Sequence, residues 1–106
     1  MRDPEVLRQV KNTLAQLAQI APGNSVEVRI PPYGAIQCVA GPRHTRGTPA
    51  NVIEMSAPTW LALASGELRW ESAMSEGLIS ASGTRADISE FLPLPTDKSE
   101  VNRITS

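Results

Sequence analysis

The stretch Asn51-Val-Ile-Glu-Met-Ser-Ala-Pro-Thr-Trp-Leu-Ala-Leu-Ala-Ser-Gly66 decides the fold of this chain. Its first five residues predict a strand, and Ser56 or Thr59 can cap the helix that follows. Gly66 is typical of a helix end. The apolar stripe of the predicted helix consists of Trp60, Leu61, Leu63 and Ala64. A strand that leads directly into a helix indicates a domain in which helices pack on a sheet.

The residues after Gly66 continue this pattern. A short helix is predicted from Trp70 to Glu76, with its apolar face at Trp70, Ala73 and Met74. Leu78–Ser82 predicts a strand of small side chains, and Gly83 turns the chain. A last helix is expected to begin at Thr84 or Asp87 and to end before the prolines at 93 and 95. Its apolar residues are Ile88, Phe91 and Leu92.

The residues before Asn51 predict one helix and two strands. Asp3 and Pro4 form a helix start, and Pro22-Gly23-Asn24 ends the helix. Its apolar positions recur every three or four residues, at Val6, Val10, Leu14, Leu17 and Ile20. Residues 25–30 alternate apolar and charged side chains, which predicts a half-buried strand. Residues 35–40 predict a second, mostly covered strand, and the four residues between them favour an antiparallel hairpin.

Grouped strands with helices between and after them indicate an α+β fold. We expect a mainly antiparallel sheet of four to five strands, with the helices packed on one face. The expected domain covers residues 3–94, and residues 95–106 are expected to form a flexible polar tail.

Composition narrows the function classes. A chain of 106 residues fits one domain. The net charge of −1 gives no broad attraction to nucleic acid. The single cysteine, Cys38, forms no internal disulfide and suits a reducing compartment. The chain starts without the apolar run of a signal peptide, and no stretch is long enough to span a bilayer. These features predict a cytoplasmic protein.

The chain resembles the sterol carrier protein family, in particular a short bacterial branch. The resemblance is carried by Pro58–Gly66, the short helix to Gly77, the strand that ends at Gly83 and the closing Phe91-Leu-Pro-Leu94. It implies a five-stranded sheet backed by helices, with an apolar cavity for lipids or acyl chains, and no enzymatic activity. The chain departs from the pattern at two points. The Pro/Gly-rich loop 41–50 replaces or shortens one strand, and the polar tail replaces an apolar C-terminal helix.

The predicted function is therefore a non-catalytic binding module for a lipid, fatty acyl chain or acyl-CoA-like molecule held between sheet and helices. The candidate cavity walls are Ile36, Ile53, Trp60, Leu63, Trp70, Met74, Ile79 and Phe91. Arg43, His44 and Arg46 are candidates for a polar mouth, because arginine matches carboxylate and phosphate. Alternatively, this loop is a connector whose arginines pair with Glu27, Glu54 or Glu71, and the tryptophans are ordinary core residues.

Other functions have less support. His44 has no identifiable catalytic partner, and Cys38 falls on a strand expected to be buried. One His and one Cys are too few for a structural zinc site, so we predict no catalytic residue, metal or cofactor. The alternative function is an accessory or protein-interaction domain with a filled core, which would bind a protein partner or form a homodimer.

Overall fold

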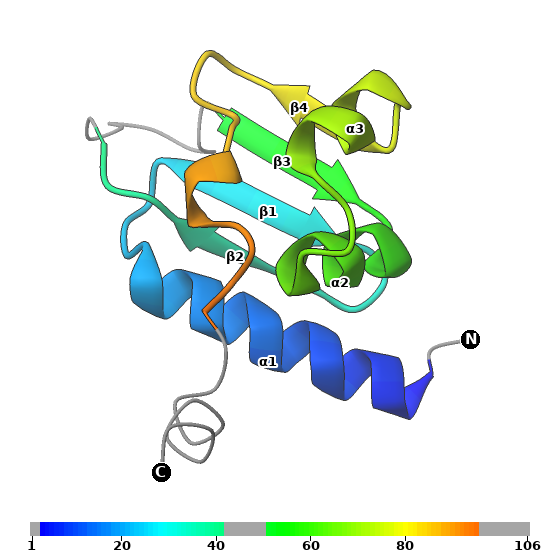
Figure 1. Ribbon diagram of the computed structural model, residues 1–106. Coiled ribbons are helices and arrows are strands. Elements are labelled where there is room, and N and C mark those ends of the chain that lie inside the picture. Colours follow the sequence, from blue (N-terminus) through cyan, green and yellow to red (C-terminus); the bar gives the residue numbers. More distant parts are fainter. Residues whose placement is uncertain (1–2, 42–50, 96–106) are drawn as a thin grey trace, which may run out of the picture.

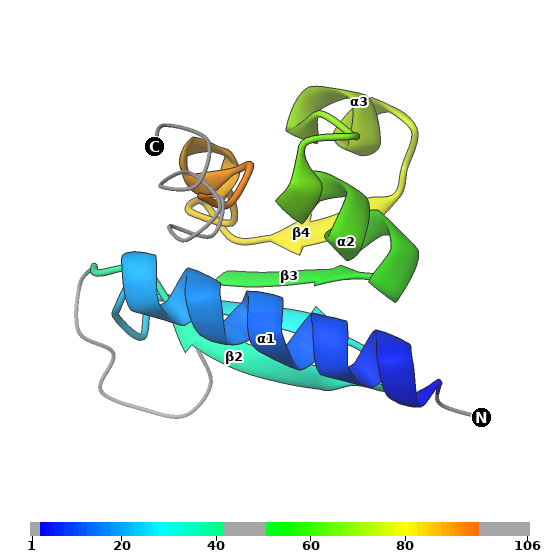
Figure 2. The same ribbon diagram turned by 60° about the horizontal axis from the view of Figure 1, so that its bottom comes forward.

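The computed structural model describes residues 3–41 and 51–95, which form two layers (Figures 1 and 2). One layer is a sheet, and the other contains helices α1 (Pro4–Ile20), α2 (Ala57–Ser65) and α3 (Trp70–Ser75). Helix α1 lies along β2 (Gly34–Cys38), and α3 lies over β4 (Ile79–Ser82). The helices cover one face of the sheet, as predicted from the sequence.

Two further strands, β1 (Val26–Ile30) and β3 (Asn51–Met55), complete a four-stranded sheet in the described residues. Its strand order is β2-β1-β3-β4. The β1–β2 hairpin is antiparallel, as expected, and so is the β3–β4 pair. The central pair is different, because β3 runs parallel to β1 with Ile53 beside Val28.

The sheet is therefore mixed, which corrects the expectation of a mainly antiparallel one. In the strand order, β3 lies on the opposite side of β1 from β2. The hairpin therefore does not extend to β3, and parallel neighbours such as β1 and β3 require a crossover connection. The family resemblance implied five strands. Residues 42–50, where one of them would be lost or shortened, lie outside the described residues.

The strands alternate as the sequence predicted. Val26, Val28 and Ile30 face the helices and are fully buried. On the opposite face, Arg29 Nη2 donates to Glu27 Oε1 at 3.1 Å, and this bond raises the pKa of the Arg29 guanidinium. Strand β2 was expected to be mostly covered, yet every second residue is exposed, because only one face of the sheet carries helices.

Helix α1 begins where predicted, because the Asp3 carboxylate accepts the backbone N–H of Glu5 at 2.8 Å. Its buried residues are Val10, Leu14 and Leu17, three of the five predicted apolar positions. Val6 packs partly buried against the core, whereas Ile20, at the last turn, is 39% exposed. The apolar stripe therefore faces the core along most of the helix.

Helix α2 is capped by Ser56, one of the two candidates, whose Oγ accepts the Thr59 N–H at 3.3 Å. It ends at Gly66, as predicted, in the left-handed conformation with φ +90°. Its buried side chains include Trp60 and Leu63, which point at the sheet. The helix thus supplies the largest buried side chain of the molecule.

The predicted last helix is wrong. Only a single 3-10 turn, η1 (Ser89–Phe91), forms there. Between the Asp87 side chain, which accepts the Ser89 N–H at 2.8 Å, and Pro93 there are too few residues for a stable helix. The segment 92–95 that follows, here called the strap, donates its Leu94 N–H to the Ala64 carbonyl at 2.9 Å.

Candidate functional site

Side chains fill the space between the sheet and α2, where the sequence predicted a cavity. Ile53, Trp60 and Leu63 are 1% exposed or less. Ile88, which directly precedes η1, is fully buried in the same hydrophobic cluster. The Trp60 indole N–H donates to Thr13 Oγ1 on α1 at 2.7 Å. Its hydrogen-bonding capacity is therefore already used within the protein.

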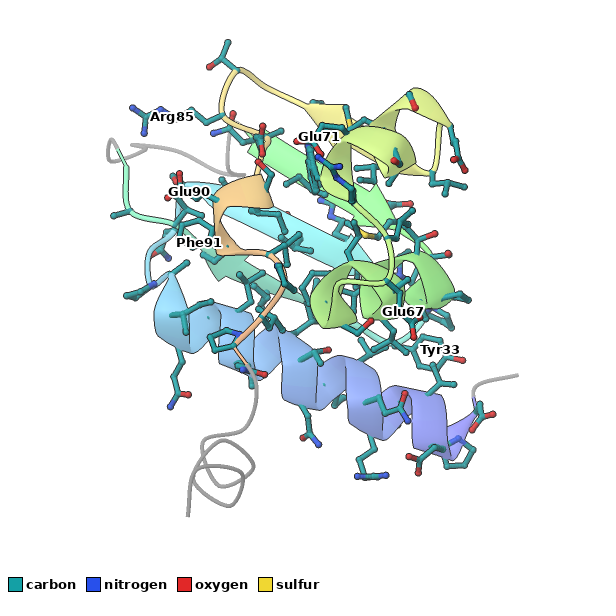
Figure 3. All side chains as sticks on the ribbon, viewed as in Figure 1. Tyr33, Glu67, Glu71, Arg85, Glu90 and Phe91 are labelled. Carbon is teal, nitrogen blue, oxygen red and sulfur yellow. The ribbon has the colours of Figure 1, made fainter. Side chains whose placement is uncertain are left out.

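The other predicted site residues are spread over the molecule. Trp70 and Ile79 are buried, Ile36 and Phe91 are partly buried against the core, and Met74 is 41% exposed. Figure 3 shows Phe91 on η1 and Glu71 on α3, two elements that are separate in the sequence. The ligand-binding role of all these residues stays a prediction. Arg43, His44 and Arg46 lie outside the described residues, and so does the predicted mouth.

Of the predicted walls, Leu63 and Trp70 meet in one surface hollow of about 250 Å³, here called the α3 groove. The α2–α3 connection and the segment from η1 to Pro93 border it. Its rim carries Arg69 and Glu71, whose charged groups are 3.8 Å apart. Because both side chains are largely exposed, their attraction contributes little to the stability of the fold. Its lining residues are Leu63, Gly66, Leu68, Arg69, Trp70, Glu71, Ser89, Leu92 and Pro93.

A larger open hollow of about 500 Å³, the α1–α2 groove, lies on the other side of the strap. Its apolar floor comes from α2 and the strap, and its polar wall comes from α1. The Gln16 side-chain amide donates to the Pro95 carbonyl at 2.7 Å, which holds the strap against α1. The lining residues are Gln9, Asn12, Thr13, Gln16, Leu61, Ala64, Ser65, Leu94 and Pro95. No strand residue lines either groove.

Sequence reasoning missed the α1–α2 groove. Gln9, Asn12 and Gln16 are not among the apolar positions of the predicted first helix, and their spacing of three and four places them on one stripe. That spacing was the available signal. The sequence pattern did not indicate that α2 and the strap would lie beside this stripe.

With the fold and the grooves described, the chain can be compared with known proteins. Residues 3–94 match a protein family described as bacterial SCP ortholog, where SCP denotes sterol carrier protein. The chain belongs to this family. The resemblance read from the sequence is thereby confirmed, and the α+β architecture is compatible with it. No curated protein matches the chain.

The sterol-carrier-like family is generally one of non-catalytic carriers. Within the described parts of this member, no three His, Cys, Asp or Glu side chains gather as a metal site would require. None of the helices described is both long and apolar enough to cross a membrane.

The one cysteine of this family member is a core thiol, as expected. Cys38 is fully buried at the end of β2, and burial raises its pKa to about 11. We expect the native protein to resist the thiol reagent DTNB at mildly alkaline pH, because the reactive thiolate is scarce and shielded. The protein in concentrated guanidinium should react at once. Fast modification of the native protein would contradict this burial.

Proposed function

We propose that this protein is a non-catalytic binding protein for a lipid-like ligand, and that the α1–α2 groove holds it. The observation that carries the proposal is the groove itself, in a member of a carrier family. Its volume of about 500 Å³ falls in the range of roughly 300–1,000 Å³ usual for small-molecule sites. Leu61, Ala64 and Leu94 provide the apolar surface that an alkyl chain would cover.

The filled core supports this placement over the interior. A guest between sheet and helices would have to displace Trp60, which is fully buried and bonded to Thr13. Interiors are close-packed, so such a displacement opens a cavity elsewhere or strains the helices. A guest in the α1–α2 groove displaces only water. The interior walls predicted from the sequence then act as the rigid base beneath the floor of the groove.

Binding to the groove predicts a dependence on chain length. Each methylene that leaves water contributes about 0.8 kcal/mol, or about a fourfold gain in affinity. Calorimetric titration with monoacylglycerols of increasing length should therefore show affinity rising by up to that factor per carbon, and then levelling off when the groove is full. Native mass spectrometry of freshly purified protein should show an added mass that solvent extraction removes.

A pair of variants locates the site. Asn12→Trp puts a bulky side chain into the groove from an exposed position, and Lys11→Trp makes the same change at the neighbouring exposed residue, which does not line it. We expect Asn12→Trp to weaken binding about tenfold or more and Lys11→Trp to leave it unchanged. Absence of saturable binding by the unaltered protein would refute the proposal, and equal binding by both variants would refute the location.

The second candidate function, a protein-interaction domain without cargo, is favoured by one observation. Two large apolar side chains near β4, Met74 and Leu78, are 41% and 42% exposed although the core is filled. Size-exclusion chromatography distinguishes the two functions. A dimer that Leu78→Ser dissociates, in a protein that binds no lipid, would support the interaction domain.

A further inference from the structure

The walls of the α1–α2 groove also indicate which lipid-like ligand it accepts, provided that the proposed function is right. We infer that the groove selects a neutral amphiphile whose head group both donates and accepts hydrogen bonds, such as a hydroxylated or amide lipid, over an anionic lipid such as a fatty acid or acyl phosphate. Two features of the described residues carry this inference: the absence of charge in the lining and the row of carboxamides.

The described residues that line the groove are all uncharged. An anion that moves from water into this groove loses part of its hydration and gains no cationic partner in return. The α3 groove differs in that its lining contains two charged residues, Arg69 and Glu71, which pair with one another. The α1–α2 groove is thus the uncharged hollow of the two and is suited to a neutral guest.

A charge pair lies at one end of the carboxamide row on α1. Glu5 lies one turn before Gln9, and its Oε2 accepts the Gln9 side-chain amide at 3.0 Å. The same carboxylate pairs with Arg8, so the two charges compensate one another at the end of the carboxamide row. An incoming carboxylate would approach a pair without net charge.

The carboxamides form a polar row along the groove. Gln9, Asn12 and Gln16 follow one another at intervals of three and four residues, over about 10 Å of helix. The Gln9 amide donates to Glu5, and the Gln16 amide donates to the Pro95 carbonyl. Each of these two amides keeps a second N–H, and among the described residues no donor satisfies their Oε1 atoms. The row therefore offers both donors and acceptors, which match a neutral hydroxyl or amide group.

Thr13 adds no donor to this wall. Its Oγ1 accepts the Trp60 indole N–H at 2.7 Å and donates to the Gln9 backbone carbonyl at 2.7 Å. Its hydroxyl hydrogen is thereby committed, so it does not donate to a guest. An ionised carboxylate or phosphate can only accept hydrogen bonds and leaves the carbonyl oxygens of the carboxamide row without a donor. The hydroxyls of a glycerol head group can both donate to the row and accept from it.

The experiment compares three ligands with the same acyl chain: monolauroylglycerol, methyl laurate and laurate. Each is titrated into the full-length protein at neutral pH, below its micelle-forming concentration. We expect monolauroylglycerol to bind about tenfold or more tightly than laurate, and methyl laurate, which has no donor, to fall between them.

Two variants test the cause. Asn12→Lys adds a cation to the polar wall and should raise the affinity for laurate relative to that for monolauroylglycerol at least several-fold. Gln19→Lys makes the same charge change at an exposed α1 residue outside the lining and should leave this ratio unchanged. If laurate binds as tightly as monolauroylglycerol while Asn12→Trp still blocks both, the selectivity is refuted and the proposed function stands. If no ligand binds, both are refuted.

Discussion

Replacement of Trp60 by alanine is expected to lower the free energy of unfolding by about 3–5 kcal/mol, the range for deletion of a large buried aromatic side chain. Trp60 is fully buried between α2 and the sheet, and its removal leaves a cavity that the surrounding strands cannot close. Because a domain of this size has a total stability of roughly 5–15 kcal/mol, the variant should lose a large part of its stability. Urea denaturation followed by far-ultraviolet circular dichroism measures the loss.

The hydrogen bond of Trp60 can be separated from its volume. Thr13→Val removes the acceptor and leaves a buried indole N–H without a partner, at a cost of about 1–3 kcal/mol. In Trp60→Phe the same Thr13→Val change should cost much less, since the donor is already gone. Leu61→Ala, a partly buried neighbour on α2, is the control and should cost less than Trp60→Ala. A loss below about 1 kcal/mol for Trp60→Ala would contradict the packed core.

The sequence predicted the elements whose signal is local. Strand β1 was evident from the alternation of Val26, Val28 and Ile30 with charged residues, because side chains of a strand alternate between its faces. Helix α2 was evident because its two ends carry local signals in the sequence, the capping residue Ser56 and the terminating glycine Gly66. The hairpin followed from the short connection between β1 and β2.

Elements that depend on distant partners were missed. The parallel pairing of β1 with β3 has no local signal, since it is decided by where a long connection returns to the sheet. The last helix was predicted from a local pattern, the helical spacing of Ile88 and Phe91, but it does not form. Ile88 is buried in the core, and Pro93 follows too soon for a helix to continue.

The candidate site was only partly predictable for a related reason. Trp60 was predicted to line a ligand site, with core packing as the alternative; it is fully buried in the core, and its role toward a ligand stays a prediction. Its hydrogen-bond partner Thr13 lies 47 positions away in the sequence. The polar wall of Gln9, Asn12 and Gln16 became part of a groove because α2 and the strap lie beside it. Sequence periodicity describes each helix face, whereas a groove is a property of two faces together.

Gly23→Ala is expected to have the second large effect, a loss of about 3 kcal/mol or more from steric overlap and backbone strain. Gly23 has φ +146°, and a Cβ added there would lie 2.2 Å from the Val39 carbonyl oxygen. That oxygen cannot move away freely, because it accepts both the N–H and the hydroxyl of Ser25, at 3.1 and 2.7 Å. The turn after α1 and the end of β2 would have to separate.

Two other glycines show which part of this loss is steric. Gly77 has φ +73° with no atom within 4 Å of an added Cβ, so Gly77→Ala should cost only about 1 kcal/mol, for the left-handed conformation. At Gly34 the added Cβ would meet Leu14 at an ordinary 3.8 Å, and Gly34→Ala should be nearly neutral. Urea midpoints should therefore rank Gly34→Ala above Gly77→Ala, and Gly77→Ala above Gly23→Ala. If Gly23→Ala were as stable as Gly77→Ala, the approach of the turn to Val39 would be looser than described.

Because the turn at Gly23 joins α1 to β1, its distortion would also shift the carboxamide row, and Gly23→Ala should weaken ligand binding where Gly77→Ala does not.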